Sequence, residues 1–209
     1  MLTVENSKLK QTLLTTNTAP CPGSEVPLLN SVLVNDSFSV VPARVLTNTL
    51  HLAENYLTID KGHADGITEN TSIISNAGVV GRVTQLNTHY SLVMPVIHIH
   101  SRTNVQHKPS EYNGNLVWNG RRTTRVTVTN IPRHITINTG DTIVTSAYSK
   151  VFPYGIPVGV VSHISADDTG NFYLLDVDLA TDFHKLNHVY ALLRDDIETV
   201  LMLEKKADE

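Results

Sequence analysis

The sequence predicts an all-β fold in which two small β-barrels follow the end of a coiled-coil helix. From residue 32 onward, short runs of β-branched residues alternate with turns of Gly, Asn and Pro, a series typical of barrels and sandwiches. Only 17% of the residues are charged, which favours strands over long solvated helices. Two small barrels suit this spacing within 209 residues better than a single large one.

The predicted strands divide the β-region into two parts. They cover residues 40–47, 56–59, 72–75, 79–83, 91–97, 115–118, 125–129, 142–146, 158–164, 172–179 and 188–193. Because residues 66–132 contain their own hairpin turns, including Asn119-Gly120, we expect them to close as the second barrel. Residues 32–65 and 133–194 are then predicted to form the first barrel together, and residues 195–209 a charged tail.

The first residues follow a helical pattern. Residues 1–17 are predicted to be the end of a coiled-coil helix, and residues 18–31 a proline-rich linker. The candidate dimer seam is spaced by four, three and four positions: Leu2, Asn6, Leu9 and Leu13. A polar Asn at a core position fixes register and oligomeric state in two-stranded coiled coils. Since the pattern is short, a frayed amphipathic tail is the alternative interpretation.

The composition excludes several functions. A net charge of −4 without a basic stripe argues against nucleic-acid binding. Cys21 is the one cysteine, which rules out an internal disulfide and a cysteine-rich zinc site. No run approaches the roughly 18 apolar residues of a membrane span, and the first residues lack a signal-peptide core. Because the helical pattern begins abruptly, Met1 is interpreted as the start of a fragment.

No catalytic, cofactor-binding or metal-binding residue is predicted. His98 and His100 lie two apart on a predicted strand, so both point to one face, but a zinc site needs further ligands that the sequence does not identify. Asp176 and Asp178 alternate with apolar residues, as in a strand with one wet face. No Gly-x-Ser-x-Gly elbow marks a serine hydrolase. A hydrolase on a protease-like double barrel is therefore only an alternative.

The segment from Phe152 to Gly159 is predicted to be a rigid loop. Its two prolines fix φ, and its two glycines permit backbone angles that other residues avoid. Its apolar side chains form the candidate partner-binding or inter-barrel site: Phe152, Tyr154 and Ile156. Burial of these residues between the barrels is the alternative, because large apolar side chains are mostly buried. Nothing in the loop can act as a paired acid and base, which favours a scaffold over an enzyme.

An ordered series of motifs resembles the MreC family of rod shape-determining proteins. It consists of Asp60-Lys-Gly62, Asp65-Gly-Ile67, Gly78-Val-Val-Gly-Arg-Val83, Gly114-Asn-Leu-Val-Trp118, Ile131-Pro132, Gly140-Asp-Thr-Ile-Val-Thr-Ser146, Phe152-Pro-Tyr-Gly-Ile-Pro-Val-Gly159 and Asn171-Phe-Tyr173. The Phe152–Gly159 string is its most specific part. Asn70 and Ala147 depart from the family pattern by replacing Gly, and Ala147 tolerates positive φ poorly. The Asn- and Thr-rich style is similar to Bacteroidetes-type members.

The resemblance implies a non-catalytic periplasmic scaffold of the bacterial cell-elongation machinery. Such a scaffold binds and regulates cell-wall synthases and is needed for rod shape. It implies the periplasmic domain of a single-pass inner-membrane protein, without cofactors. The implied partners are a class B penicillin-binding transpeptidase, MreD, MreB and a second copy of the chain. A glycan-binding β-module is a further alternative, against which the aromatic content of 6% with one Trp counts.

Overall fold

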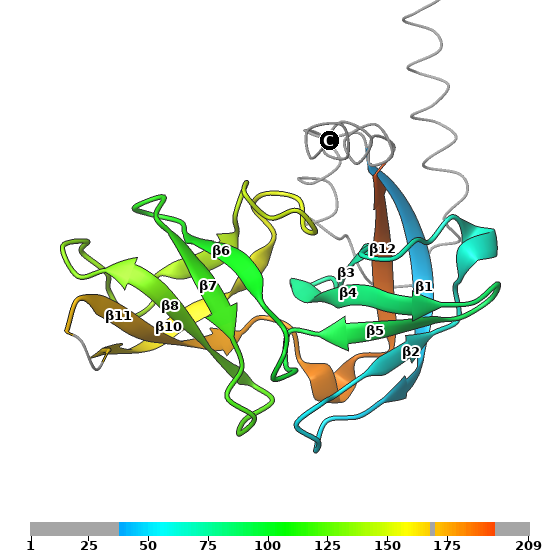
Figure 1. The fold of residues 1–209 in the computed structure, drawn as a ribbon, viewed down its shortest axis with the longest axis horizontal. Coiled ribbons are helices and arrows are strands. Elements are labelled where there is room, and N and C mark those ends of the chain that lie inside the picture. Colours follow the sequence, from blue (N-terminus) through cyan, green and yellow to red (C-terminus); the bar gives the residue numbers. More distant parts are fainter. Residues whose placement is uncertain (1–37, 168–169, 195–209) are drawn as a thin grey trace, which may run out of the picture.

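A computed structural model describes residues 38–167 and 170–194, which form two closed β-barrels (Figure 1). All strand pairs within both barrels are antiparallel. The predicted all-β fold of two small barrels is therefore confirmed. The seam residues Leu2, Asn6, Leu9 and Leu13, the linker 18–31 and the tail 195–209 lie outside the described residues.

The first barrel, here called the N/C barrel, combines strands from both ends of the described chain. In chain order its strands are β1 (Phe38–Asn48), β2 (Leu57–Ile59), β3 (Ser72–Ile74), β4 (Val79–Leu86), β5 (Ser91–Pro95) and β12 (His188–Arg194). They close in the order β1-β12-β3-β4-β5-β2. A short 3-10 helix, η1 (His63–Asp65), lies between β2 and β3.

The second barrel, here called the inserted barrel, forms between β5 and β12. Its strands are β6 (Thr103–His107), β7 (Asn113–Val117), β8 (Arg125–Pro132), β9 (Thr142–Thr145), β10 (Pro157–Ala166) and β11 (Phe172–Leu179), closed in the order β10-β11-β8-β7-β6-β9. Two linkers join the barrels. The first is residues 96–102, and the second is residues 180–187, which include the 3-10 helix η2 (Phe183–Lys185).

The predicted division between the barrels is wrong. The strands β3, β4 and β5 belong to the N/C barrel, and β9, β10 and β11 belong to the inserted barrel. The reason lies in pairs that are distant in sequence: Leu57 of β2 faces Val93 of β5, and Val105 of β6 faces Thr145 of β9. Hairpin turns show which neighbours pair, but no local pattern marks the distant partner that closes a barrel. The sequence analysis also missed β6, which has few apolar residues.

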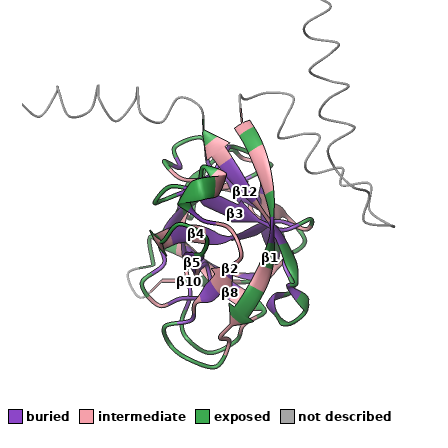
Figure 2. Ribbon diagram, turned by 90° about the vertical axis from the view of Figure 1, so that its right-hand side faces the viewer, coloured by how far each residue is buried: buried purple, intermediate pink, exposed green. Residues whose placement is uncertain are grey.

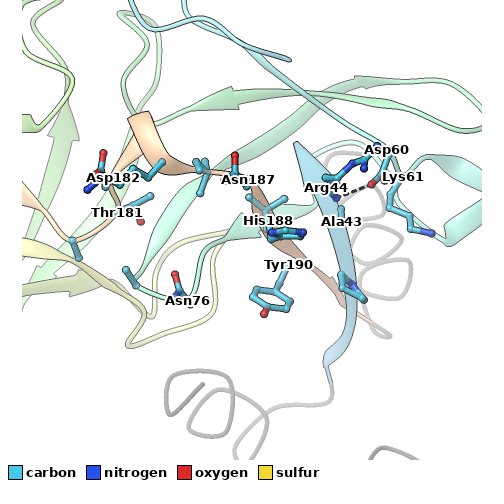
Figure 3. Close-up of a pocket in the computed structure, with 16 residues that line it drawn as sticks. Ala43, Arg44, Asp60, Lys61, Asn76, Thr181, Asp182, Asn187, His188 and Tyr190 are labelled. Atoms are coloured by element: carbon cyan, nitrogen blue, oxygen red, sulfur yellow. Dashed lines mark hydrogen bonds and ion pairs between the residues drawn. The ribbon is translucent and has the colours of Figure 1, made fainter. Parts of the chain in front are cut away.

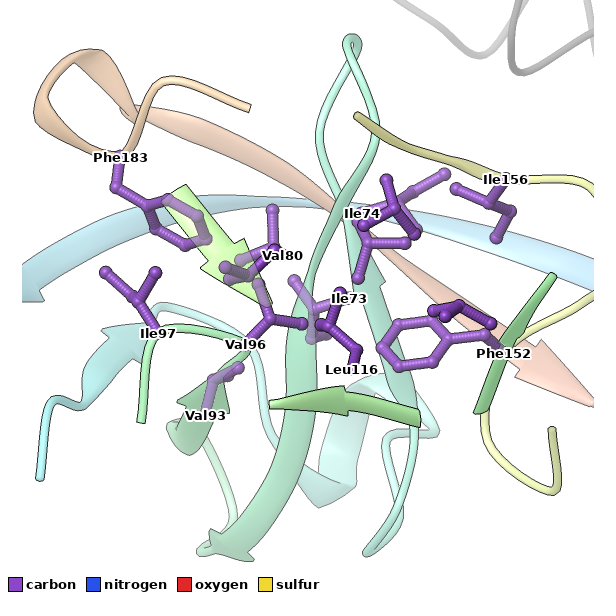
Figure 4. Packing of buried hydrophobic residues seen from close by; sticks show 14 of the residues in the cluster. Ile73, Ile74, Val80, Val93, Val96, Ile97, Leu116, Phe152, Ile156 and Phe183 are labelled. Atoms are coloured by element: carbon purple, nitrogen blue, oxygen red, sulfur yellow. The ribbon is translucent and has the colours of Figure 1, made fainter. Parts of the chain in front are cut away.

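Buried side chains alternate with exposed ones and meet in one continuous core. Along β8, Val126, Val128 and Ile131 are buried while the intervening residues are not. In Figure 2, β3 is buried over its whole length, whereas β1 carries exposed residues. The apolar cluster includes residues of both barrels, such as Ile74 and Leu116 (Figure 4). The two barrels therefore share a core.

Hydrogen bonds fasten the second linker to the N/C barrel. Thr181 of the linker donates from Oγ1 to the carbonyl of Val79 (3.0 Å) and lies 2.9 Å from the hydroxyl of Ser75. The side-chain amide of Asn48 donates to the carbonyl of Phe183 (2.8 Å). Ser75 and Thr181 are both buried, so water does not compete for these bonds.

The β3–β4 turn touches the inserted barrel at Gly78. A Cβ atom at this position would lie 2.2 Å from the carbonyl oxygen of Pro157, at the start of β10. Gly78→Ala should therefore destabilise the protein by about 1–3 kcal/mol, the usual cost of overpacking. Chemical denaturation measures this change. Asn76→Ala, at the exposed tip of the same turn, is the control and should be close to neutral. An unchanged midpoint for Gly78→Ala would show that the barrels do not meet here.

Candidate functional site

Two buried hydroxyl residues at the end of β9 hydrogen-bond to the loop between β9 and β10. Thr145 Oγ1 donates to the carbonyl of Pro153 and accepts from the backbone N–H of Ile156 (2.9 Å). Ser146 Oγ donates to the side-chain carbonyl of Asn113 and accepts from the N–H of Tyr148 (3.1 Å). Both hydroxyl residues are fully buried. The path of the loop is therefore fixed by buried hydrogen bonds, as the rigid-loop prediction requires.

The structure separates the three residues predicted for this site. Phe152 and Ile156 are buried, at 3% and 0% exposure, and belong to the shared core (Figure 4). Tyr154 lies between them in sequence and is 53% exposed. Tyr148 on the same loop is 75% exposed, and the sequence analysis did not single it out. Two of the three predicted residues thus hold the loop in place, while Tyr154 and Tyr148 form its accessible surface.

The loop also touches the N/C barrel through β12. The guanidinium of Arg194 donates to the carbonyl of Lys150 (3.3 Å) and lies over the ring of Phe38, 5.5 Å from its centre. Because Phe38 and Arg194 face each other across β1 and β12, the loop rests on the end of this strand pair. The exposed tyrosines are consequently fixed relative to both barrels.

Two departures from the family pattern are accommodated differently. Asn70 has φ of 64°, a left-handed conformation that Asn tolerates better than most residues. Its side-chain carbonyl accepts from Arg82 (2.8 Å), which adds a contact that Gly cannot make. Ala147 is not among the described residues with positive φ, so its turn does not require Gly.

A groove of about 700 Å³ lies beside the second linker (Figure 3). Arg44 and His188, which face each other across β1 and β12, line it together with Tyr190. Asp60 and Asp182 lie at opposite ends of the labelled residues in Figure 3. The Asp60 carboxylate accepts from the backbone N–H of Arg44 (2.7 Å), and Asp182 pairs with Lys185 (3.8 Å). The two acids are therefore separately engaged and do not form an acid–base pair.

A serine, a histidine and an aspartate do meet in the inserted barrel. His107 Nδ1 lies 2.6 Å from Ser110 Oγ, and His107 Nε2 lies 3.0 Å from Asp141 Oδ2. The N–H of Asn138 and, after it, the His107 imidazole hold the pKa of Asp141 below its usual value. The His107 side chain has no exposed surface, so it cannot pass a proton to a leaving group as a hydrolase requires. This network fastens the β6–β7 turn to the start of β9.

The structure also corrects the expectation for His98 and His100. They lie in the first linker, beyond the end of β5 at Pro95, and not on a strand. Among residues 38–167 and 170–194, no group of three or more His, Cys, Asp or Glu side chains is placed to hold a metal ion. The same part of the chain has no helix with the length and hydropathy of a membrane span.

Residues 45–192 match the family described as rod shape-determining protein MreC, barrel core. The chain belongs to the MreC family. The cell shape-determining protein MreC of Haemophilus influenzae is 27% identical over 199 residues, and that of Escherichia coli is 26% identical over 199 residues. These matches cover 91% of this chain and 56% and 54% of the relatives. The chain thus spans about half the length of the curated relatives it matches.

Solved structures share the fold at lower sequence identity. MreC from Pseudomonas aeruginosa superposes with a TM-score of 0.69 and 19% identity, covering 74% of this chain and 99% of that one. A complex between PBP2 and MreC from Helicobacter pylori gives a TM-score of 0.58 at 17% identity, with 74% and 98% coverage. These similarities agree with the resemblance found in the sequence. The matched family and the relatives are all described as shape-determining proteins.

The left-handed residue of the β9–β10 loop provides a test of its rigidity. Gly155 has φ of +88°, and no heavy atom of the described residues lies within 4 Å of the place a Cβ would occupy. A side chain there is therefore strained only through the backbone. Gly155→Val should destabilise the protein by about 1–3 kcal/mol. Gly155→Asn is the matched control and should cost less, because Asn tolerates this conformation. Equal melting midpoints for the wild-type protein and the Gly155→Val variant would contradict a fixed loop.

Proposed function

We propose that this chain is a non-catalytic periplasmic scaffold of the cell-elongation machinery that binds a class B penicillin-binding transpeptidase. The observation that carries the proposal is the surface of the β9–β10 loop. Tyr148 and Tyr154 are exposed there, on a backbone held by the buried Thr145 and Ser146. A complex of PBP2 with a structurally similar MreC from Helicobacter pylori supports the choice of partner.

The physical argument concerns the cost of binding. A mobile loop loses conformational freedom when a partner orders it, and that loss reduces affinity. Here internal hydrogen bonds and the buried Phe152 and Ile156 order the loop before any partner arrives. Tyrosine is also one of the residues that carry most binding energy in protein interfaces. The loop therefore has the properties of a preformed binding surface.

Pairing of a partner strand with the barrels is a less favourable mode of binding. Both barrels are closed. Within residues 38–167 and 170–194, the first part of β1 pairs with β12 alone, because β2 begins to pair only at Val45. The N–H of Arg44 donates to Asp60, on the side of β1 opposite β12. Residues two apart on a strand direct their N–H groups to the same side, so Pro42 would face this open edge, and proline has no N–H to offer a partner strand. Proline at such an edge prevents further pairing. Docking through side chains is thus favoured.

The two alternative functions are weaker. A glycan-binding module needs an exposed aromatic platform, but Trp118 is only 5% exposed and donates its Nε1–H to the carbonyl of Arg122 (2.7 Å). A hydrolase on a protease-like fold has no support from the buried His107 network. Neither alternative uses the exposed tyrosines as directly as a protein partner does.

The remaining parts of the proposal concern the protein as a whole. We place the chain in the periplasm, as the domain of a single-pass inner-membrane protein, with MreD and MreB as further partners. We also propose self-association through Leu2, Asn6, Leu9 and Leu13. The family membership of residues 45–192 supports the location and the partners, and the spacing of the four residues in the sequence supports the seam.

Tyr154→Ser tests the binding surface. Removing an exposed hot-spot aromatic should weaken binding to the ectodomain of the class B transpeptidase by at least about 1–2 kcal/mol. Calorimetric titration measures the affinity, and a thermal melt confirms that the variant is folded. Tyr90→Ser is the matched control, since Tyr90 is 48% exposed but belongs to the β4–β5 turn of the N/C barrel. Full affinity of folded Tyr154→Ser protein would place the interface elsewhere.

The proposed coiled-coil seam predicts a second outcome. A chain extended upstream of Met1 should dimerise more tightly than residues 1–209, because two heptads rarely suffice for a stable dimer. In the longer chain Leu9→Asp should loosen the dimer, whereas Gln11→Asp, which lies off the seam, should not. Sedimentation equilibrium gives the masses. One mass for every protein in the series would refute the seam.

A further inference from the structure

The first linker between the barrels, residues 96–102, is built around the side chain of His98. This side chain is 1% exposed. Its Nδ1 accepts a hydrogen bond from the N–H of His100 (3.0 Å), and its carbonyl accepts from the N–H of Ser101 (2.9 Å). A neutral imidazole that accepts at Nδ1 carries its proton on Nε2. The linker turn therefore depends on the unprotonated Nδ1 of a buried histidine.

Among the described residues, no side chain accepts a hydrogen bond from the His98 ring, and the one carboxylate nearby, Glu54, does not contact it. Nε2 of His98 is buried and has no hydrogen-bond partner within the described chain. The ring of Tyr56 meets it edge-on, with centroids 5.0 Å apart. The nearby Glu54 carboxylate lies 3.5 Å from Nε2 of His100 instead, and both of these side chains are more than half exposed. The guanidinium of Arg102 donates to the carbonyls of Ile99 and Ser101 (2.8 and 2.7 Å).

Burial lowers the pKa of His98 below its ordinary value, while Glu54 opposes this shift and His100 adds to it. Protonation at Nδ1 would also place a new N–H directly opposite the N–H of His100, which now donates to that nitrogen. The two donors would repel each other. A protonated His98 must therefore leave its site and reach water. Its departure breaks the hydrogen bond between Nδ1 and the N–H of His100, which supports the turn.

This turn fastens the linker to both barrels. The side-chain amide of Asn55 donates to the carbonyl of Ile97 (2.8 Å), and the N–H of Ile99 donates to the carbonyl of Ala53 (3.2 Å). On the other side, Ile99 Cγ2 lies 3.7 Å from the Cβ position of Gly120, in the turn between β7 and β8. Ile99 thus bridges the N/C barrel and the inserted barrel.

We propose that His98 is a pH-sensitive latch of the first linker, which holds the two barrels in one orientation while neutral and releases them when protonated. This inference goes beyond the proposed binding function and does not depend on it. The second linker stays in place through the Thr181 and Asn48 hydrogen bonds, so release changes the orientation of the barrels without separating them.

The sign of the effect follows from proton linkage. The latched state holds a histidine with a depressed pKa, so the released state binds the proton more readily. The latch is at full strength above about pH 6.5, the ordinary pKa of histidine, and weakens as the pH falls toward the depressed pKa. The opening equilibrium constant rises by at most about tenfold per pH unit in this window.

Amide hydrogen exchange of the full chain tests the latch. Between pH 7.5 and 5.5, protection of the Ile99, His100 and Ser101 amides should fall by up to about tenfold after correction for intrinsic exchange. The amide of Val83, bonded to the carbonyl of Thr71 inside the N/C barrel (2.9 Å), should not respond. Equal linker protection at both pH values would overturn the proposal.

Two variants separate His98 from other titrating groups. His98→Asn keeps an acceptor for the N–H two residues later, as in an Asx turn, but does not titrate. Its linker protection should be independent of pH, whatever its absolute stability. His100→Asn removes the exposed neighbour and should keep most of the pH response. A His98→Asn protein with the full response would assign it to another group and overturn the proposal.

A distance measurement tests whether the barrels move. Spin labels at Glu69→Cys in the N/C barrel and Thr139→Cys in the inserted barrel, with Cys21→Ser, report the separation of two exposed positions. The distance distribution should broaden at pH 5.5 in the wild-type background and stay narrow with His98→Asn. A distribution that does not change with pH would overturn the claim that the latch controls barrel orientation.

Discussion

The fold depends on β12, which pairs with β1 on one side and with β3 on the other. Without it the N/C barrel has two open edges, which are costly and invite pairing with other chains. Yet β12 is reached only after the whole inserted barrel has been built between residues 103 and 179. Closure of the N/C barrel therefore requires the chain to return past the inserted barrel. The core shared by the two barrels keeps the ends of the inserted barrel close to the edges that β12 must join.

The shared apolar core joins the barrels, and backbone groups and buried hydroxyls add contacts at its edge. Gly78 leaves room for the carbonyl of Pro157, and Thr181 binds both Ser75 and the carbonyl of Val79. Such contacts have defined directions, unlike purely apolar packing, and so favour one orientation of the barrels. The partly satisfied His98 in the first linker is the exception, since its Nε2 is buried without a partner in the described chain. Local opening begins where stability is lowest, and the buried unpaired Nε2 makes the first linker such a place in our proposal.

Local patterns predicted every strand except β6, and also the Pro/Gly loop, because a hairpin or such a loop is determined by residues close in sequence. The strand β11 has the predicted bounds, and Gly155 has the left-handed φ that its type suggests. The barrel to which a strand belongs was not predictable. Val93 and Val177 are both valines in predicted strands, and it is their distant partners, Leu57 and Val126, that lie in different barrels. The same limit applies to the candidate site. Whether an apolar loop residue is buried depends on which residues of the other barrel pack against it. For this reason the sequence could not show that Phe152 and Ile156 are buried while Tyr154 is exposed.

The position of the β9–β10 loop links the proposed binding surface to the proposed latch in the first linker. The loop presents Tyr154 and Tyr148 outward, while Phe152 and Ile156 lie in the core shared by the barrels and Lys150 contacts Arg194 of β12. A change in barrel orientation must therefore alter either the packing beneath the loop or its contact with β12. A partner that binds the tyrosines in one arrangement favours that arrangement by its difference in affinity for the two. Linkage is reciprocal, so such a partner also opposes the release of His98. The two proposals together therefore imply that binding at the loop and protonation at the first linker are coupled through the contact between the barrels.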